Sequence, residues 1–280
     1  MQNYQTLIRA GELAAILDDP RIVVIDVRHD LGDHGLGARR YAESHIHGAH
    51  FLSVENDLSG PKTGRNGRHP LPAPEAFAAT LSALGVDAGK QVVAYDQAQG
   101  TYSARLWWML RWLGHRNVAV LDGGLDAWVR AGFGVTAEVP ARKPARFVPV
   151  VSDSPVPVEL LSAHLADIDY TVVDARGAER FRGINETIDP VGGHIPGSHN
   201  RPYTQNLNAD NTFKSPDALR AEWLAALGGR TPAQIVHSCG SGVTACNNLL
   251  AMEVAGLSSS RLYPGSWSEW SADPARPIER

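Results

Sequence analysis

The sequence predicts two α/β domains in tandem, each a parallel sheet flanked by helices. Two observations support this fold class. Short β-branched runs alternate with segments of helical periodicity, which is typical of βαβ crossovers in a parallel sheet. Several segments also recur once along the chain in the same order. A length of 280 residues suits two ordinary domains.

The predicted strands are short, apolar and rich in β-branched residues, as buried parallel strands are. They are residues 92–95, 118–121, 171–173 and 234–237. The predicted helices either have a proline near their start or follow a strand directly. They are residues 74–84, 103–113, 215–227 and 243–255.

Four segments of the first half return in the second half, which indicates a duplicated domain. The paired segments are residues 22–28 with 171–176, 45–49 with 194–198, 92–96 with 235–239, and 123–128 with 265–270. Five prolines punctuate residues 140–157, and proline favours an extended surface path. We therefore expect a first domain over residues 1–140, a linker over 141–157 and a second domain over 158–280.

Composition excludes several classes of protein. Lys and Arg number 26 and Asp and Glu number 30, so the formal charge of −4 argues against a nucleic-acid binder. Two cysteines are too few for a disulfide framework or a Cys-rich zinc site, and the histidines show no metal-ligand spacing. No segment is apolar enough to span a membrane, and the first 20 residues lack the apolar core of a signal peptide. We expect a cytoplasmic protein.

The most informative segment ends a predicted strand at Cys239. Gly240, Ser241 and Gly242 follow, and then a helical run begins. Glycines let such a loop turn several backbone N–H groups inward, and the helix adds its positive N-terminal end. A thiolate, a persulfide or a bound oxyanion would be stabilised there. The alternative is a buried, inert cysteine.

A cysteine phosphatase is the competing interpretation of this loop. Such an enzyme needs an arginine six positions after the cysteine to clamp the phosphate. That position is Ala245, and the loop contains no lysine or arginine. A dianionic phosphate would lack its counter-charge, so the sequence argues against this chemistry.

The loop over residues 239–245 resembles the active loop of the 3-mercaptopyruvate sulfurtransferases in the rhodanese superfamily. Residues 122–124, 180–183, 194–197 and 265–270 carry further motifs of the tandem-domain enzymes, and the resemblance covers essentially the whole chain. It implies two rhodanese-like domains, of which only the second is catalytic. Asp96 stands at the first copy's equivalent of Cys239 and cannot carry sulfane sulfur.

The resemblance also implies a mechanism and its residues. The Cys239 thiolate takes sulfur from a small anionic donor, and a thiol, cyanide or thioredoxin-like acceptor then removes it from the Cys239 persulfide. No metal or organic cofactor is implied. Ser241 matches the serine that works with a histidine and an acid, here His69 and Glu55. The family usually has aspartate at position 55, so Asp57 is an alternative.

The remaining predicted site residues bind the donor. They are Arg180, Gly240, Gly242, Val243 and Thr244. By resemblance, Arg180 holds the donor's carboxylate, because a guanidinium binds a carboxylate bidentately. The alternative for Arg180 is a salt bridge to Asp174 or Glu179, and for His69 a solvated loop position.

The donor and the function class stay open. The family's second arginine is missing from residues 183–193, which keeps thiosulfate beside 3-mercaptopyruvate as a donor. A neutral, hydroxyl-bearing loop favours 3-mercaptopyruvate. A carrier of persulfide without turnover, or a redox-sensing binding module, is the alternative to an enzyme. Cys246 is expected to be a small buried residue, and His45 and His194, which recur in both copies, to be structural.

Overall fold

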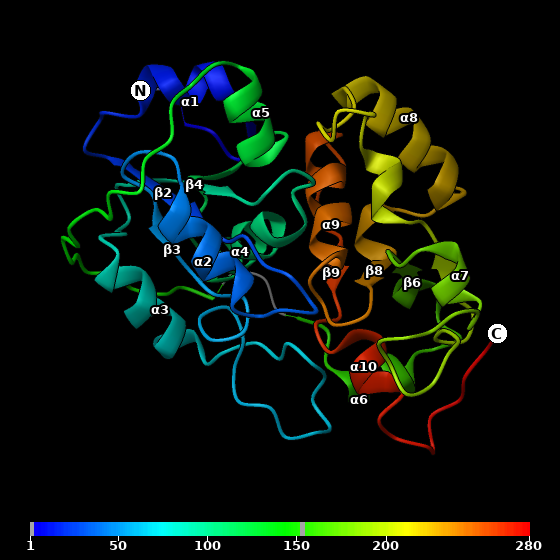
Figure 1. The fold of residues 1–280 in the computed structure, drawn as a ribbon. Coiled ribbons are helices and arrows are strands. Elements are labelled where there is room, and N and C mark those ends of the chain that lie inside the picture. The colour runs from blue at the N-terminus through cyan, green and yellow to red at the C-terminus, as the bar shows by residue number, and fades with distance from the viewer. Residues whose placement is uncertain (1–2, 152–154) are drawn as a thin grey trace. The chain divides into compact units, whose positions relative to one another are not determined.

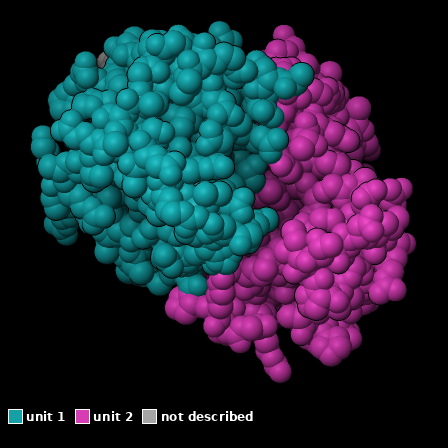
Figure 2. Space-filling model, viewed as in Figure 1, with its two compact units in different colours: residues 1–60, 72–153, 209–213 teal, residues 61–71, 154–208, 214–280 magenta. Residues whose placement is uncertain are grey.

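The computed structural model describes residues 3–151 and 155–280 (Figure 1). The chain divides into two compact units (Figure 2). The first comprises Met1–Gly60, Pro72–Asp153 and Ala209–Phe213, and the second comprises Pro61–Leu71, Ser154–Asn208 and Lys214–Arg280. Each unit therefore includes a short segment from the other half of the sequence. The expected boundaries at residues 140 and 158 stay predictions, and residues 152–154 of the expected linker lie outside the described residues.

The first unit contains a five-stranded parallel sheet in the order β1-β5-β4-β2-β3. Its strands are β1 (Leu7–Ile8), β2 (Ile22–Asp26), β3 (His50–Phe51), β4 (Gln91–Tyr95) and β5 (Val118–Leu121). Its helices are α1 (Ala10–Ile16), α2 (Leu36–Glu43), α3 (Pro74–Ala83), α4 (Thr101–Trp112) and α5 (Gly124–Arg130). Helix α4 is buried along almost its whole length, Arg105 and Arg111 included.

The second unit repeats the plan with a four-stranded parallel sheet in the order β7-β6-β8-β9. Its strands are β6 (Thr171–Asp174), β7 (His199–Asn200), β8 (Ile235–Ser238) and β9 (Arg261–Leu262). Its α-helices are α6 (Val158–Ala163), α7 (Ala178–Phe181), α8 (Pro216–Leu227), α9 (Ala245–Val254) and α10 (Ser266–Trp270). Short 3₁₀ turns lie at η1 (Ile168–Tyr170), η2 (Tyr203–Asn206) and η3 (Pro232–Gln234).

The strand registers confirm the internal duplication. Asp26 of β2 pairs with Tyr95 of β4, and Asp174 of β6 pairs with Ser238 of β8. The residues that follow, Asp96 and Cys239, therefore occupy equivalent places at the carboxyl ends of the central strands. Open parallel sheets bind ligands at this edge.

The two recurring histidines also occupy matching places. His45 forms an isolated antiparallel bridge with Thr136, and His194 forms one with Glu279. Nδ1 of each ring lies within hydrogen-bonding distance of a backbone oxygen, that of Tyr41 in the first unit and of Phe181 in the second. Both are buried, which fits the structural role expected from their repetition.

The predicted strands and helices are all present, with boundaries that shift by at most two residues. The largest difference that bears on function is the start of α9, which lies at Ala245 rather than Val243. Gly242 has φ +74°, a left-handed conformation that interrupts a right-handed helix. The loop after Cys239 is therefore longer than predicted. Among the described residues, no helix has both the length and the apolar character needed to span a membrane.

Candidate active site

Cys239 begins the loop that joins β8 to α9. Its side chain is buried, with the residue 1% exposed, and it forms no disulfide. Its surroundings are polar. Ser266 Oγ accepts a hydrogen bond from the Cys239 backbone N–H at 3.0 Å and lies 4.0 Å from Cys239 Sγ.

Helix α10 anchors this loop. The backbone N–H groups of Trp267 and Ser268 donate to the carbonyl oxygens of Cys239 and Gly240 at 3.0 and 2.9 Å. Ser266 has φ +53°, a strained conformation for a residue with a Cβ, and its hydroxyl donates to Tyr263 O at 2.9 Å. The hydrogen bonds on both sides of Ser266 hold that conformation.

Several backbone N–H groups of the loop lack an acceptor. Among the residues that the structure describes, the N–H groups of Gly240, Ser241, Val243 and Thr244 form no hydrogen bond with the protein. They precede the ten-residue helix α9, whose N-terminal end carries partial positive charge. The loop thus retains the donor capacity expected of an anion cradle.

Ser241 and His69 meet in the second unit. Ser241 Oγ lies 2.7 Å from His69 Nδ1, and both residues are buried, at 6% and 3% exposure. His69 belongs to the segment Pro61–Leu71, which is part of the second unit. The alternative of a solvated His69 is wrong. Ser241 stands two residues after Cys239. This buried hydroxyl–imidazole pair can therefore deliver a proton to a group bound at the cysteine, or accept one from it.

Arg180 forms different ion pairs from those considered in its alternative interpretation. Its Nε donates to Glu186 Oε2 at 3.0 Å, and its Nη2 donates to Asp189 Oδ2 at 3.0 Å. Asp174 instead pairs with Arg176 at 2.7 Å. The guanidinium lies beside the loop, because a Cβ added to Gly240 would be 3.6 Å from Arg180 Nη2.

Arg68 supplies a second guanidinium at the same place. A Cβ added to Gly240 would lie 2.8 Å from Arg68 Nη2. Arg68 Nη1 donates to Asp189 Oδ1, and the backbone N–H of Arg68 donates to Ser268 Oγ at 3.0 Å. Burial lowers the pKa of the Arg68 guanidinium below its ordinary value, and the negative charge of a Cys239 thiolate opposes that shift.

The proposed acids belong to the first unit. Glu55 Oε1 lies 3.7 Å from His34 Nε2 and 3.9 Å from His29 Nε2. Asp57 Oδ2 accepts a hydrogen bond from the Ser53 backbone N–H at 2.7 Å. Support of His69 by Glu55 or Asp57 stays a prediction.

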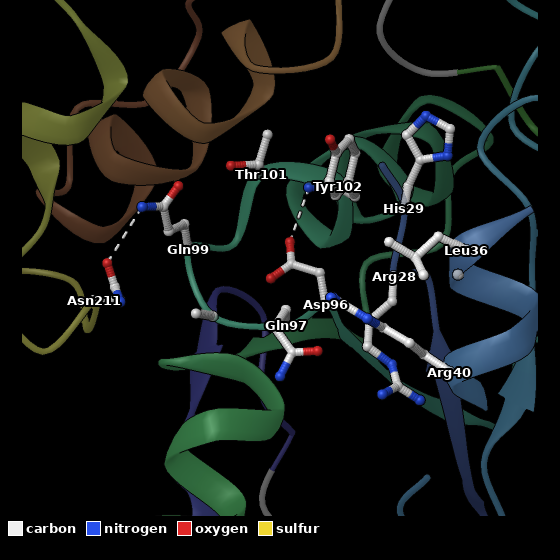
Figure 3. A pocket seen from close by; sticks show the side chains of 12 residues that line it. Arg28, His29, Leu36, Arg40, Asp96, Gln97, Gln99, Thr101, Tyr102 and Asn211 are labelled. Carbon is white, nitrogen blue, oxygen red and sulfur yellow. Dashed lines mark hydrogen bonds between the residues drawn. The ribbon is translucent and has the colours of Figure 1, made fainter. Parts of the chain in front are cut away.

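The equivalent loop of the first unit is occupied by its own side chain. The Asp96 carboxylate accepts hydrogen bonds from the N–H groups of Gly100, Tyr102 and Ser103 at 2.9 to 3.2 Å, and from Ser103 Oγ at 3.1 Å. Figure 3 shows Asp96 directed toward the backbone of Tyr102. A cavity of about 240 Å³ lies beside this loop. Here an internal carboxyl group occupies the N–H groups at the start of α4.

Sequence reasoning missed Arg68, Asp189, Glu186 and Ser266. Arg68 directly precedes His69, but the second arginine of the family was expected only within residues 183–193. The usable signal was the pair of acids in that interval, Glu186 and Asp189, which require cationic partners once buried. Ser266 lies within the motif at residues 265–270, but its role was not assigned, because that role depends on a left-handed backbone conformation that the sequence does not show.

Comparison with known proteins agrees with this architecture. The rhodanese-like domain family matches residues 9–131 and 157–273. A Pseudomonas aeruginosa protein named "Probable 3-mercaptopyruvate sulfurtransferase" is 46% identical over 275 residues, which are 97% of each chain. A Mycobacterium tuberculosis protein named "Putative thiosulfate sulfurtransferase SseB" is 40% identical over 280 residues, covering 99% of this chain and 97% of the relative.

A solved structure gives the same result. The crystal structure of the 3-mercaptopyruvate sulfotransferase SseA from Escherichia coli superposes with a TM-score of 0.82 at 33% identity, over 94% of this chain and 99% of that one. Together with the full-length relatives, it confirms the expected tandem fold and the sulfurtransferase class. The chain therefore belongs to the rhodanese family and contains two rhodanese-like domains.

Proposed function

We propose that this sulfurtransferase uses Cys239 as its nucleophile and 3-mercaptopyruvate as its donor. The Cys239 thiolate attacks the donor sulfur, so that an S–S bond forms and the C–S bond breaks. The electron pair of the C–S bond passes to the carbon, and protonation completes pyruvate. Cys239 is left as a persulfide, and an acceptor thiolate then attacks the outer sulfur and restores the Cys239 thiolate.

The observation that supports this donor best is the Ser241–His69 pair beside Cys239. An enolate leaving group needs a proton, and a hydroxyl oriented 2.7 Å from an imidazole can supply one. Sulfite leaving from thiosulfate has no such need. The relative with 46% identity carries the same donor in its name.

Arg180 has the charge and the position to hold the donor carboxylate. The unpaired backbone N–H groups of Gly240, Val243 and Thr244 can stabilise the persulfide anion. Gly242 supports the cradle through its left-handed turn. The proposed sulfur acceptor is a low-molecular-weight thiol or a thioredoxin-like protein. The proposed compartment is the cytoplasm. Thiosulfate is the second candidate donor, since the Mycobacterium tuberculosis relative is named for it.

The test is replacement of Cys239 by serine. We expect Cys239→Ser to abolish thiocyanate formation from cyanide with either donor, because a hydroxyl cannot accept sulfane sulfur at this site. Cys246→Ser is the matched control and should retain activity, since Cys246 lies inside α9 and contacts Gly242 O at 3.4 Å. Turnover by Cys239→Ser would show that Cys239 is not the nucleophile. A single round of persulfide formation without turnover by the wild type would favour a carrier.

A further inference from the structure

We propose that Arg68 binds the anionic group of the donor together with Arg180, and that Asp189 tunes this site toward singly charged donors. This inference rests on the proposed function and assigns its donor selectivity to two residues outside the Cys239 loop. Three features of the second unit carry it: a shared carboxylate, unused guanidinium N–H groups, and a balance of charge.

The shared carboxylate is Asp189. Arg68 binds one of its oxygens and Arg180 the other, the latter at 3.0 Å. The Asp189 side chain is 1% exposed, whereas those of Arg68 and Arg180 are 28% and 25% exposed. A buried carboxylate therefore fixes the spacing of two partly accessible guanidinium groups.

The unused N–H groups lie next to the nucleophile. Arg68 Nε is buried without a hydrogen-bond partner, and no bond to the protein is found for Arg68 Nη2 or Arg180 Nη1 within residues 3–151 and 155–280. A Cβ on Gly240 would lie 2.8 Å from Arg68 Nη2 and 3.8 Å from Arg180 Nη1. Two guanidinium groups thus have donors facing the residue that follows Cys239, where a carboxylate bound bidentately would hold the donor sulfur near Cys239.

The charge balance distinguishes the two donors. Glu186 and Asp189, with side chains 4% and 1% exposed, neutralise the pair of cations formed by Arg68 and Arg180. Arg176 adds no surplus, because it pairs with Asp174 at 2.7 Å and lies 3.7 Å from Glu186. A monoanion such as 3-mercaptopyruvate needs less compensation in such a site than the thiosulfate dianion does.

The experiment compares Asp189→Asn and Arg68→Gln with the wild type. Competitive inhibition by pyruvate and by sulfate measures preference for a monoanion over a dianion, using whichever donor the wild type turns over. We expect Asp189→Asn to raise the affinity for sulfate relative to that for pyruvate by about tenfold, because one nearby negative charge is removed. Arg68→Gln should raise KM for the donor about tenfold with a smaller effect on kcat, as loss of a charge-assisted contact predicts.

The controls remove the same charges elsewhere. One control is Arg65→Gln, since Arg65 is exposed in the same loop as Arg68. The other is Asp217→Asn, since Asp217 is exposed in the first turn of α8. Both should leave the inhibition ratio and KM unchanged. Circular dichroism establishes that each variant is folded. Should Asp189→Asn fail to fold, Arg68→Lys provides the second test. Because lysine keeps the positive charge, this variant should retain the ratio of sulfate to pyruvate inhibition constants while binding both ligands more weakly.

An unchanged ratio in folded Asp189→Asn, or an unchanged KM in folded Arg68→Gln, overturns the inference. A sulfate-to-pyruvate ratio altered by Arg68→Lys overturns it as well. If the wild type transfers sulfur through Cys239 but these variants behave like it, the proposed function stands and only this inference fails. If the wild type transfers sulfur from neither donor, the proposed function itself fails.

Discussion

Ser241 and His69 show how far single residues could be assigned from the sequence. Cys239 was identified from the pattern of strand, glycine-rich loop and helix, whereas Ser241 and His69 were assigned through the resemblance to the sulfurtransferases. The structure brings Ser241 and His69 together at 2.7 Å. Arg68 escaped assignment because its partners, Asp189 and the loop at Gly240, are distant in sequence. A local motif reveals residues that act within one loop, and the family resemblance added the distant His69. Neither indicated Arg68.

The proton-delivery role of Ser241 predicts a donor-dependent defect. We expect Ser241→Ala to lower kcat with 3-mercaptopyruvate by roughly 10²-fold, the usual contribution of a general acid, and to affect thiosulfate only slightly. Steady-state kinetics with both donors measure this difference. Ser258→Ala, at an exposed position, is the control. Equal losses with the two donors would contradict a role in protonating the leaving group.

The strand–loop–helix element at β8 and α9 owes its shape to close backbone contacts. The strand and the helix follow from hydrophobic pattern, and both were predicted. The loop geometry was not predictable in detail, since it depends on α10, which returns from later in the chain to bind the Cys239 and Gly240 carbonyl oxygens. Gly242 shows the constraint most directly, because a Cβ there would lie 2.1 Å from Pro264 O.

This contact predicts the effect of Gly242→Ala. The substitution meets both backbone strain at φ +74° and a steric clash with Pro264 O. Gly197→Ala is a matched control, since Gly197 has φ +73° with no heavy atom within 4 Å of an added Cβ. We expect the control to lose about 1–2 kcal/mol of unfolding free energy from strain. Gly242→Ala should lose about 1–3 kcal/mol more from overpacking and should also impair sulfur transfer. Urea denaturation measures both, and equal destabilisation would refute the clash.

At the scale of the whole molecule, the chain is a duplication with exchanged segments. The repeats predicted two α/β domains, and the sheets of the two units share the same central register. Repetition could not show that Ala209–Phe213 belongs to the first unit. There, Asp122 accepts a hydrogen bond from the Phe213 N–H at 2.8 Å, a contact between residues 91 positions apart.

Asp122 makes the stability of the first unit depend on pH. Burial, aided by nearby Asp210, raises the pKa of Asp122 from 3.8 to about 6. Between these values the folded protein keeps a proton that the unfolded chain has released, so the unfolding free energy falls as pH rises from about 4 to about 6. The total loss is about 3 kcal/mol.

Asp122→Asn tests this dependence, because the amide keeps an acceptor for Phe213 and does not ionise. We expect the variant to gain stability relative to the wild type across that pH range, as measured by urea denaturation at intervals from pH 4 to 7. Glu75→Gln removes an exposed carboxylate from α3 as a control. Parallel curves for Asp122→Asn and the wild type would show that Asp122 ionises normally.

The Asp96 carboxyl group has a consequence for any attempt to install a second nucleophile. It satisfies three backbone N–H groups at the start of α4 and so braces this loop from within. Asp96→Cys would leave these buried amides unsatisfied, whatever the new thiol could do chemically. A reactive centre in the first domain would therefore come at a cost in folding stability.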